Sequence, residues 1–271
     1  MSEVSGMQRT STEWTGKSTA AVARVGARRD DGRGALTWLA ALILLAGFLA
    51  AIPLPGRAAI YTPPQGCRLD YTVQNRGCSV VQYYRCDADP KGDQRSATFG
   101  QEGLTHLSHI DDQTRWLEST DPQTGLQDVL EKGAADDASF DTLLNTGYDD
   151  FDFWTVSNTG ERLRHVGFDE LTGETVTIDG VTLEKTRFQL TTFSESGEVL
   201  IERKGQQFIS RKMRRFYGGI EQQRDWTGQQ LNTDDSPVLF SFPGEKGFGD
   251  TTPQFDCDQL MTGLLSSEDD A

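Results

Sequence analysis

Side chains that commonly carry out catalysis are scarce in this sequence. Its 271 residues include three histidines, and they contain no G-x-S-x-G segment of the kind that presents a nucleophilic serine. No C-x-x-C pair is present either, which argues against a structural zinc site. Nucleophilic catalysis therefore finds no support in the sequence, and we predict no cofactor.

Positive charge is also scarce, and it is unevenly distributed. The chain has 26 Lys and Arg against 41 Asp and Glu, for a net charge of −15. Residues 1–58 carry a net charge of +3, whereas residues 59–271 carry −18. Such a negative domain repels nucleic-acid phosphates and anionic lipid headgroups, so we predict no nucleic-acid partner. Its acidity serves either solubility or an acidic recognition surface.

A long hydrophobic run lies near the start of the chain. Residues 35–52 (ALTWLAALILLAGFLAAI) contain no charge, and Arg28, Arg29 and Arg33 precede them. The pattern predicts a signal-peptide core or a membrane span whose N-terminal end stays in the cytoplasm. The length of the run favours a retained single-pass anchor. The prolines and small residues that follow favour cleavage after Ala58, so both outcomes stay open.

The run divides the chain into segments and sets its location. Everything after it is expected in the periplasm, with membrane contact only through residues 35–52. No linker or repeat divides the remainder, which is long enough for one sizeable core. The predicted segments are 1–34, a basic and disordered cytoplasmic leader; 35–58, the signal peptide or anchor; 59–265, a single periplasmic β domain; and 266–271, an acidic tail.

All four cysteines lie beyond the hydrophobic run. Because an exported domain is exposed to an oxidising compartment, we predict two disulfides, for which three connectivities are possible. If residues 76–77 form a two-residue turn, the flanking strands place Cys67 directly opposite Cys86, at a distance that suits a disulfide. The hypothesis is therefore that Cys67 pairs with Cys86, and Cys78 with Cys257.

Most of the domain has the pattern of short β-strands separated by turns that contain glycine. Asp179-Gly180 is the strongest hairpin signal, and Thr186, Phe188, Leu190 and Thr192 are predicted to share one strand face. The pattern predicts a mainly β fold, a single curved antiparallel sheet forming a half-barrel or barrel. The predicted strands are 68–74, 79–85, 95–101, 104–110, 114–118, 151–157, 162–169, 175–178, 181–193, 199–204, 208–217 and 220–226.

Two short helices are predicted between the strands. Apolar residues at 126, 129 and 130 have helical spacing, with Asp121 as a capping residue and Lys132-Gly133 as the end. The second helix spans 139–146, where Ser139 is the cap and Gly147 the stop.

The histidines offer one candidate site. His106, His109 and Asp112 lie within seven residues and are the only residues in the sequence that we consider for a metal-dependent hydrolase. A strand, however, carries residues three apart on opposite faces, so the alternative is a set of polar positions at a strand end. His165 is expected to be an ordinary strand residue.

Several charged clusters have ordinary structural interpretations. Residues 87–93 resemble the opening of a calcium-binding loop, but Lys91 and Thr98 stand where ligands are needed, so we predict a solvated turn. Residues 211–215 are basic, and we predict a strand whose charges form ion pairs rather than a partner site. Asp149, Asp150 and Asp152 are interpreted as the polar side of the strand that carries Phe151 and Phe153.

Aromatic residues are concentrated in the strand region. A curved sheet of this size either fills its interior with rings or leaves a cavity for an apolar ligand, and the sequence leaves both open. The candidate ligand-lining residues are Phe151, Phe153, Phe188, Phe208 and Trp226.

The order of elements over residues 68–228 resembles the periplasmic lipoprotein-carrier superfamily, in which a half-barrel meander holds short helices in its mouth. Residues 181–193 and 199–217, with the phrase Gly205-Gln206-Gln207-Phe208-Ile209-Ser210-Arg211, also resemble uncharacterised exported bacterial proteins. The resemblance implies non-enzymatic binding of an apolar ligand, such as a lipid or acyl chain, or of a cell-envelope partner. Two disulfides depart from the carrier pattern. The alternatives are a structural or interaction module without a pocket, and the metal-dependent hydrolase.

Overall fold

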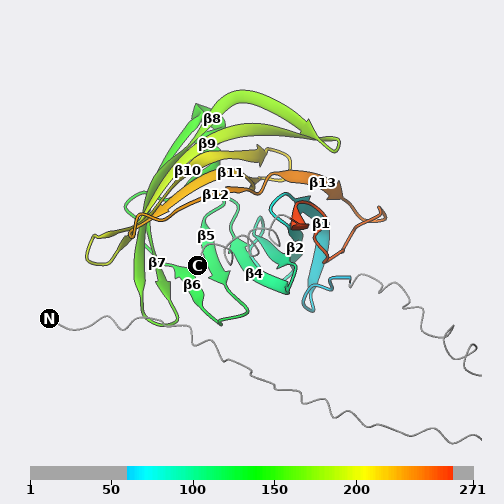
Figure 1. Ribbon diagram of the computed structural model, residues 1–271, viewed down its shortest axis with the longest axis horizontal. Coiled ribbons are helices and arrows are strands. Elements are labelled where there is room, and N and C mark those ends of the chain that lie inside the picture. The colour runs from blue at the N-terminus through cyan, green and yellow to red at the C-terminus, as the bar shows by residue number, and fades with distance from the viewer. Residues whose placement is uncertain (1–59, 259–271) are drawn as a thin grey trace, which may run out of the picture. The chain divides into compact units, whose positions relative to one another are not determined.

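A computed structural model describes residues 60–258 of the chain, which form one antiparallel sheet of thirteen strands (Figure 1). Its strand order is β12-β11-β10-β9-β8-β7-β6-β5-β4-β3-β2-β1-β13, a meander in which only the last strand crosses to the opposite edge. The strands are β1 (Cys67–Asn75), β2 (Ser79–Cys86), β3 (Gln94–Gly100), β4 (Gly103–Ile110), β5 (Trp116–Thr120), β6 (Gln127–Leu130), β7 (Tyr148–Ser157), β8 (Arg162–Ile178), β9 (Val181–Ser194), β10 (Val199–Ser210), β11 (Arg215–Asp225), β12 (Gln230–Asp234) and β13 (Pro237–Ser241).

The predicted N-terminal and C-terminal segments lie outside these residues. They are the leader 1–34, the hydrophobic run 35–52 with its cleavage point at Ala58, and the tail 266–271. Among residues 60–258, no helix has the length and apolar character needed to cross a membrane.

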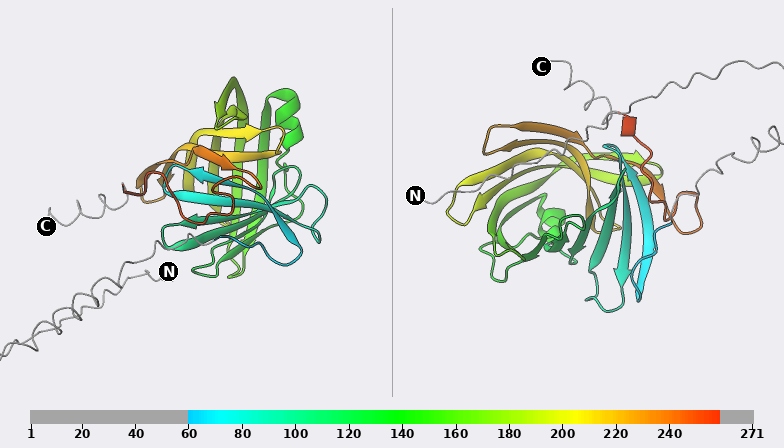
Figure 2. Two further views of the ribbon diagram at one scale, coloured as in Figure 1. Left: turned by 90° about the vertical axis from the view of Figure 1, so that its right-hand side faces the viewer. Right: turned by 60° about the horizontal axis from the view of Figure 1, so that its bottom comes forward.

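The one helix that lies entirely within residues 60–258 is α2 (Phe140–Thr146), the second of the two predicted helices. Its ends follow local rules: the Ser139 hydroxyl accepts from the Thr142 amide, and Gly147, at φ 86°, ends the helix. Phe140 and Leu143 are buried, and the helix lies over one end of the curved sheet (Figure 2).

The first predicted helix is wrong, because its residues form a hairpin. Asp121 accepts hydrogen bonds from the amides of Gln123 and Thr124, which closes a turn, and β6 then pairs with β5 and β7. Leu126 and Val129 remain exposed, so the helical spacing of apolar residues produces no buried stripe. Pairing on both sides of β6 outweighs the helical pattern.

The two disulfides join Cys67 to Cys86 and Cys78 to Cys257, as predicted. The predicted register is only partly correct. The turn after β1 is one residue longer than expected, since Asn75 pairs with Ser79, and a bulge at Asp70 restores Cys67 to its place opposite Cys86.

The sheet is strongly curved but does not close, because its edge strands β12 and β13 are not paired with each other. The turn between β8 and β9 covers the edge of β13: the Phe240 amide donates a hydrogen bond to Asp179 Oδ2. Glycines in the strands permit close approach. A Cβ on Gly167 would lie 2.1 Å from the Gln189 carbonyl oxygen and 2.8 Å from the Phe151 ring.

Two hydrophobic clusters lie on the concave side. The first cluster is packed and brings the two ends of the sheet together, and the Tyr71 and Tyr217 hydroxyls hydrogen-bond within it at 2.9 Å. Its members are Tyr71, Val73, Val81, Tyr83, Leu183, Phe208, Tyr217 and Phe240. The second consists of Phe151, Phe153, Phe188 and Leu190, and it borders a cavity. The interior is therefore filled in one part and hollow in another.

Candidate functional site

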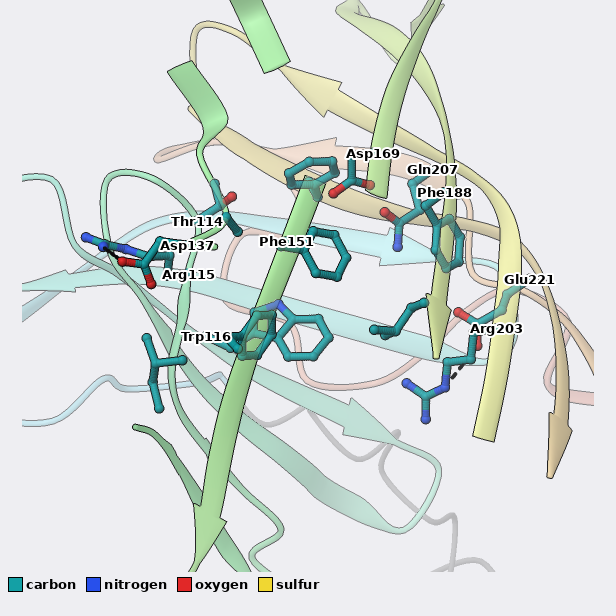
Figure 3. A pocket seen from close by; sticks show the side chains of 15 residues that line it. Thr114, Arg115, Trp116, Asp137, Phe151, Asp169, Phe188, Arg203, Gln207 and Glu221 are labelled. Carbon is teal, nitrogen blue, oxygen red and sulfur yellow. Dashed lines mark hydrogen bonds and ion pairs between the residues drawn. The ribbon is translucent and has the colours of Figure 1, made fainter. Parts of the chain in front are cut away.

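A cavity of about 150 Å³ lies in the curve of the sheet (Figure 3). Residues of seven consecutive strands, β5 to β11, line it together with the segment before α2, so it is on the concave side. Its apolar lining is Trp116, Leu130, Ala138, Phe151, Phe153, Phe188, Leu190 and Phe216. Its polar lining is Thr114, Arg115, Asp137, Asp169, Arg203, Gln207 and Glu221.

Aromatic rings form one wall of the cavity. Strand alternation turns Phe151 and Phe153 of β7 inward, with their ring centroids 5.8 Å apart. Trp116 meets Phe153 edge to face at 5.7 Å and is 43% exposed, so this wall reaches the surface. Gly167 lies opposite Phe151 on β8 and leaves the space that the ring occupies.

A cation and a carboxylate lie at one side of the cavity, from adjacent strands. Arg203 Nε of β10 is 3.5 Å from Glu221 Oε1 of β11. Nε is buried and makes no hydrogen bond within the described residues. Burial raises the pKa of Glu221, an effect that the positive charge of Arg203 opposes.

Two carboxyl groups lie opposite each other on β7 and β8, Asp149 buried and Asp169 partly buried. Asp149 is paired with Asp169 in the register, and Asp169 also lines the cavity. Burial, and then the charge of Asp149, raise the pKa of Asp169 to about 7. Burial raises the pKa of Asp149 to about 6, although the Ser139 amide donates to its carboxylate. Near neutral pH, Asp169 can therefore donate a hydrogen bond as a protonated acid.

The placement of Asp149 corrects the sequence interpretation. Asp150 and Asp152 do lie on the polar side of β7, where Asp152 forms an ion pair with Arg164. Asp149 instead shares the buried face with Phe151, because residues two apart on a strand point the same way.

His165 lies next to the aromatic wall and stacks on Phe153 with ring centroids 5.0 Å apart. Its Nε2 is 3.0 Å from Thr155 Oγ1, and its Nδ1 is 3.2 Å from Thr192 Oγ1. Burial, and then the positive charge of Arg203, lower the pKa of His165 to about 4. The imidazole is therefore neutral at pH 7, and both of its nitrogens have partners.

The candidate hydrolase residues are not assembled into a site. His106 and His109 lie on one strand, β4, three residues apart, and His109 Nε2 contacts Asp93 Oδ2 at 2.8 Å. Asp112 is exposed in the following turn. Across residues 60–258, no group of three or more His, Cys, Asp or Glu side chains is arranged to hold a metal ion.

The other charged clusters have structural partners. In the turn at residues 87–93, Asp89 binds Arg95 through two hydrogen bonds of 2.7 and 3.0 Å. Residues 211–214 form the turn between β10 and β11, not the predicted strand. Arg211 forms an ion pair with Glu184, and Arg214 one with Asp141.

Three of the five candidate ligand-lining residues border the cavity: Phe151, Phe153 and Phe188. Phe208 instead belongs to the first, packed cluster, and Trp226 is 75% exposed in the turn after β11. Sequence reasoning missed Trp116, Asp169 and Arg203. For Arg203, the alternation of side chains along β10 could have been the signal, because residues two apart share a face and Arg203 is two residues after Ile201. In the structure Arg203 pairs with Leu190 of the cavity wall.

No family model, no curated protein and no solved structure matches this chain. The cavity and its lining are therefore the basis for a functional proposal.

Proposed function

We propose that this protein is exported to the periplasm and binds a small apolar ligand in the cavity, without catalysing a reaction on it. The observation that carries the proposal is an aromatic-lined hollow on the concave side of the sheet, beside the packed first cluster. Two disulfides indicate an oxidising environment and support export. The cavity favours a ligand-binding protein over an interaction module without a pocket.

The volume of the cavity limits the ligand. A space of about 150 Å³ is comparable to engineered protein cavities that hold one benzene molecule. The ligand class is therefore a single ring or a short acyl chain. A membrane lipid with long chains needs the sheet to open further, in the direction of the partly exposed Trp116.

Binding of uncharged probes tests the proposal. Titration calorimetry of the full chain, purified after export, with toluene and with 1-hexanol should show saturable binding. Ala138 lines the cavity, so Ala138→Trp fills it and should abolish binding.

The matched control is Ala135→Trp, three residues earlier at an exposed position, which should bind as the wild type does. The proposal would be contradicted if the wild type bound neither probe, or if Ala138→Trp bound the probes as tightly as the wild type does.

A further inference from the structure

We propose that the ligand carries a carboxylate, and that Arg203 binds it; this inference rests on the cavity being a ligand site. The ligand class is then a compact carboxylic acid with an aromatic or short aliphatic body. The body would occupy the space beside Phe151, Phe153 and Phe188, and the carboxylate would meet the guanidinium.

The first argument is that Arg203 differs from every other arginine between residues 60 and 258. The others all donate at least one hydrogen bond to a side-chain or main-chain oxygen; they are Arg68, Arg76, Arg85, Arg95, Arg115, Arg162, Arg164, Arg187, Arg211, Arg214, Arg215 and Arg224. The Arg203 side chain donates none within this part of the chain; its Nε is buried, while the side chain as a whole is 36% exposed. Arg215 Nε is also buried without a partner, but Arg215 donates through Nη1 to Gln94 Oε1 at 3.4 Å. An arginine has five donors, and a buried donor without an acceptor is destabilising.

The second argument is that Glu221 does not satisfy Arg203. At 3.5 Å from Nε, its nearest oxygen makes an ion pair but no hydrogen bond. Figure 3 shows both side chains at the same side of the cavity. The planar fork of a guanidinium matches the two oxygens of a carboxylate, so a bound carboxylate would provide the acceptors that the protein lacks here.

The third argument concerns charge. Residues 59–271 carry a net charge of −18, which disfavours an anionic ligand in general. Asp169 and Glu221 also line the cavity, whereas His165 beside it is neutral near pH 7. Arg115 also lines the cavity, but it is ion-paired with Asp111 and Asp137. A preference for an anion at this site would therefore have to come from Arg203, and this predicts a change of preference when Arg203 is removed.

The test compares hexanoate, 1-hexanol and hexylamine, which share one chain length and differ in the head group. Calorimetry uses the full chain, purified after export, at pH 7.5. We expect hexanoate to bind at least tenfold more tightly than 1-hexanol. Arg203→Gln should weaken hexanoate binding until it is weaker than 1-hexanol binding, while 1-hexanol binding stays the same and shows that the cavity is intact.

Three further variants make the test specific. Glu221→Gln removes the competing carboxylate and should tighten hexanoate binding. The double variant Arg203→Gln, Glu221→Gln removes both charges of this pair and should again favour 1-hexanol. Arg224→Gln is the matched control, because Arg224 is ion-paired with Glu202 on the other face of the same hairpin, and it should change nothing.

The outcomes separate this inference from the proposed function. Equal binding of hexanoate and 1-hexanol by the wild type, or tightest binding of hexylamine, overturns the role of Arg203 and leaves an apolar site in place. Binding of none of the three overturns both.

Discussion

The disulfide between Cys78 and Cys257 should contribute more to stability than the one between Cys67 and Cys86. The first closes a chain segment with a sequence separation of 179, and the second one of 19. Cross-linking limits the entropy of the unfolded chain by an amount that grows with the logarithm of the loop length. The expected contributions to the free energy of unfolding are about 5 kcal/mol for the long loop and about 3 kcal/mol for the short one.

The structure also provides a competing expectation. Two buried glutamine side chains bind the C-terminal segment: Gln74 Nε2 donates to the Thr252 carbonyl at 3.0 Å, and Gln82 Nε2 donates to the Asp250 carbonyl at 2.6 Å. If these contacts can break while the sheet stays folded, loss of the long bridge releases the segment locally and costs less than the loop length predicts.

Paired alanine substitutions distinguish the two cases. One variant carries Cys78→Ala with Cys257→Ala, and the other carries Cys67→Ala with Cys86→Ala. Urea unfolding measures the free energy of unfolding and the m-value, and a thermal scan should show a decrease in Tm of about 2–4 °C per kcal/mol. If loss of the long bridge costs no more than loss of the short one, the loop-entropy reasoning is refuted for this fold.

Two further predictions concern the walls of the cavity. Gly167→Ala should destabilise the protein by about 1–3 kcal/mol in urea unfolding, because its Cβ would collide with the Gln189 carbonyl and the Phe151 ring. The control is Gly100→Ala, whose Cβ meets only a methyl group at 3.3 Å. An equal effect of the two substitutions would contradict the packing argument. The pKa of Asp169 is raised from its ordinary value of 3.8 to about 7, so protonation of Asp169 favours the folded state, and stability falls as pH rises from about 4 to 7. Asp169→Asn should therefore be more stable than the wild type at pH 8, and its stability should depend less on pH. Parallel pH profiles of stability for the two proteins would refute the assignment.

Local chemistry was sufficient to predict α2 and the faces of β9. Ser139 and Gly147 cap α2 with their own side chain and backbone, so a few neighbouring residues decide both ends. Likewise, alternation alone places Thr186 and Phe188 on the buried face. The helix predicted at 121–132 was wrong because its residues pair on both sides as β6. One partner, β5, is the other strand of the hairpin, but the second, β7, follows α2 in the sequence and cannot be found from local spacing.

The disulfides show where sequence reasoning reaches its limit. The pairing of Cys67 with Cys86 follows from hairpin geometry, yet the register has one more turn residue than expected and a compensating bulge at Asp70. Two local irregularities cancelled, and the pairing was correct although the turn was not.

The amino-acid sequence by itself determined that residues 60–258 form a curved antiparallel sheet with two disulfides, because alternation, turn residues and cysteine positions are properties of short segments. Only the tertiary structure decided which aromatic rings fill the interior and which border a cavity. That outcome depends on how thirteen strands curve together, so Phe208 is packed, Trp226 is exposed, and Arg203 Nε lies beside Glu221 without a hydrogen-bonding partner among residues 60–258.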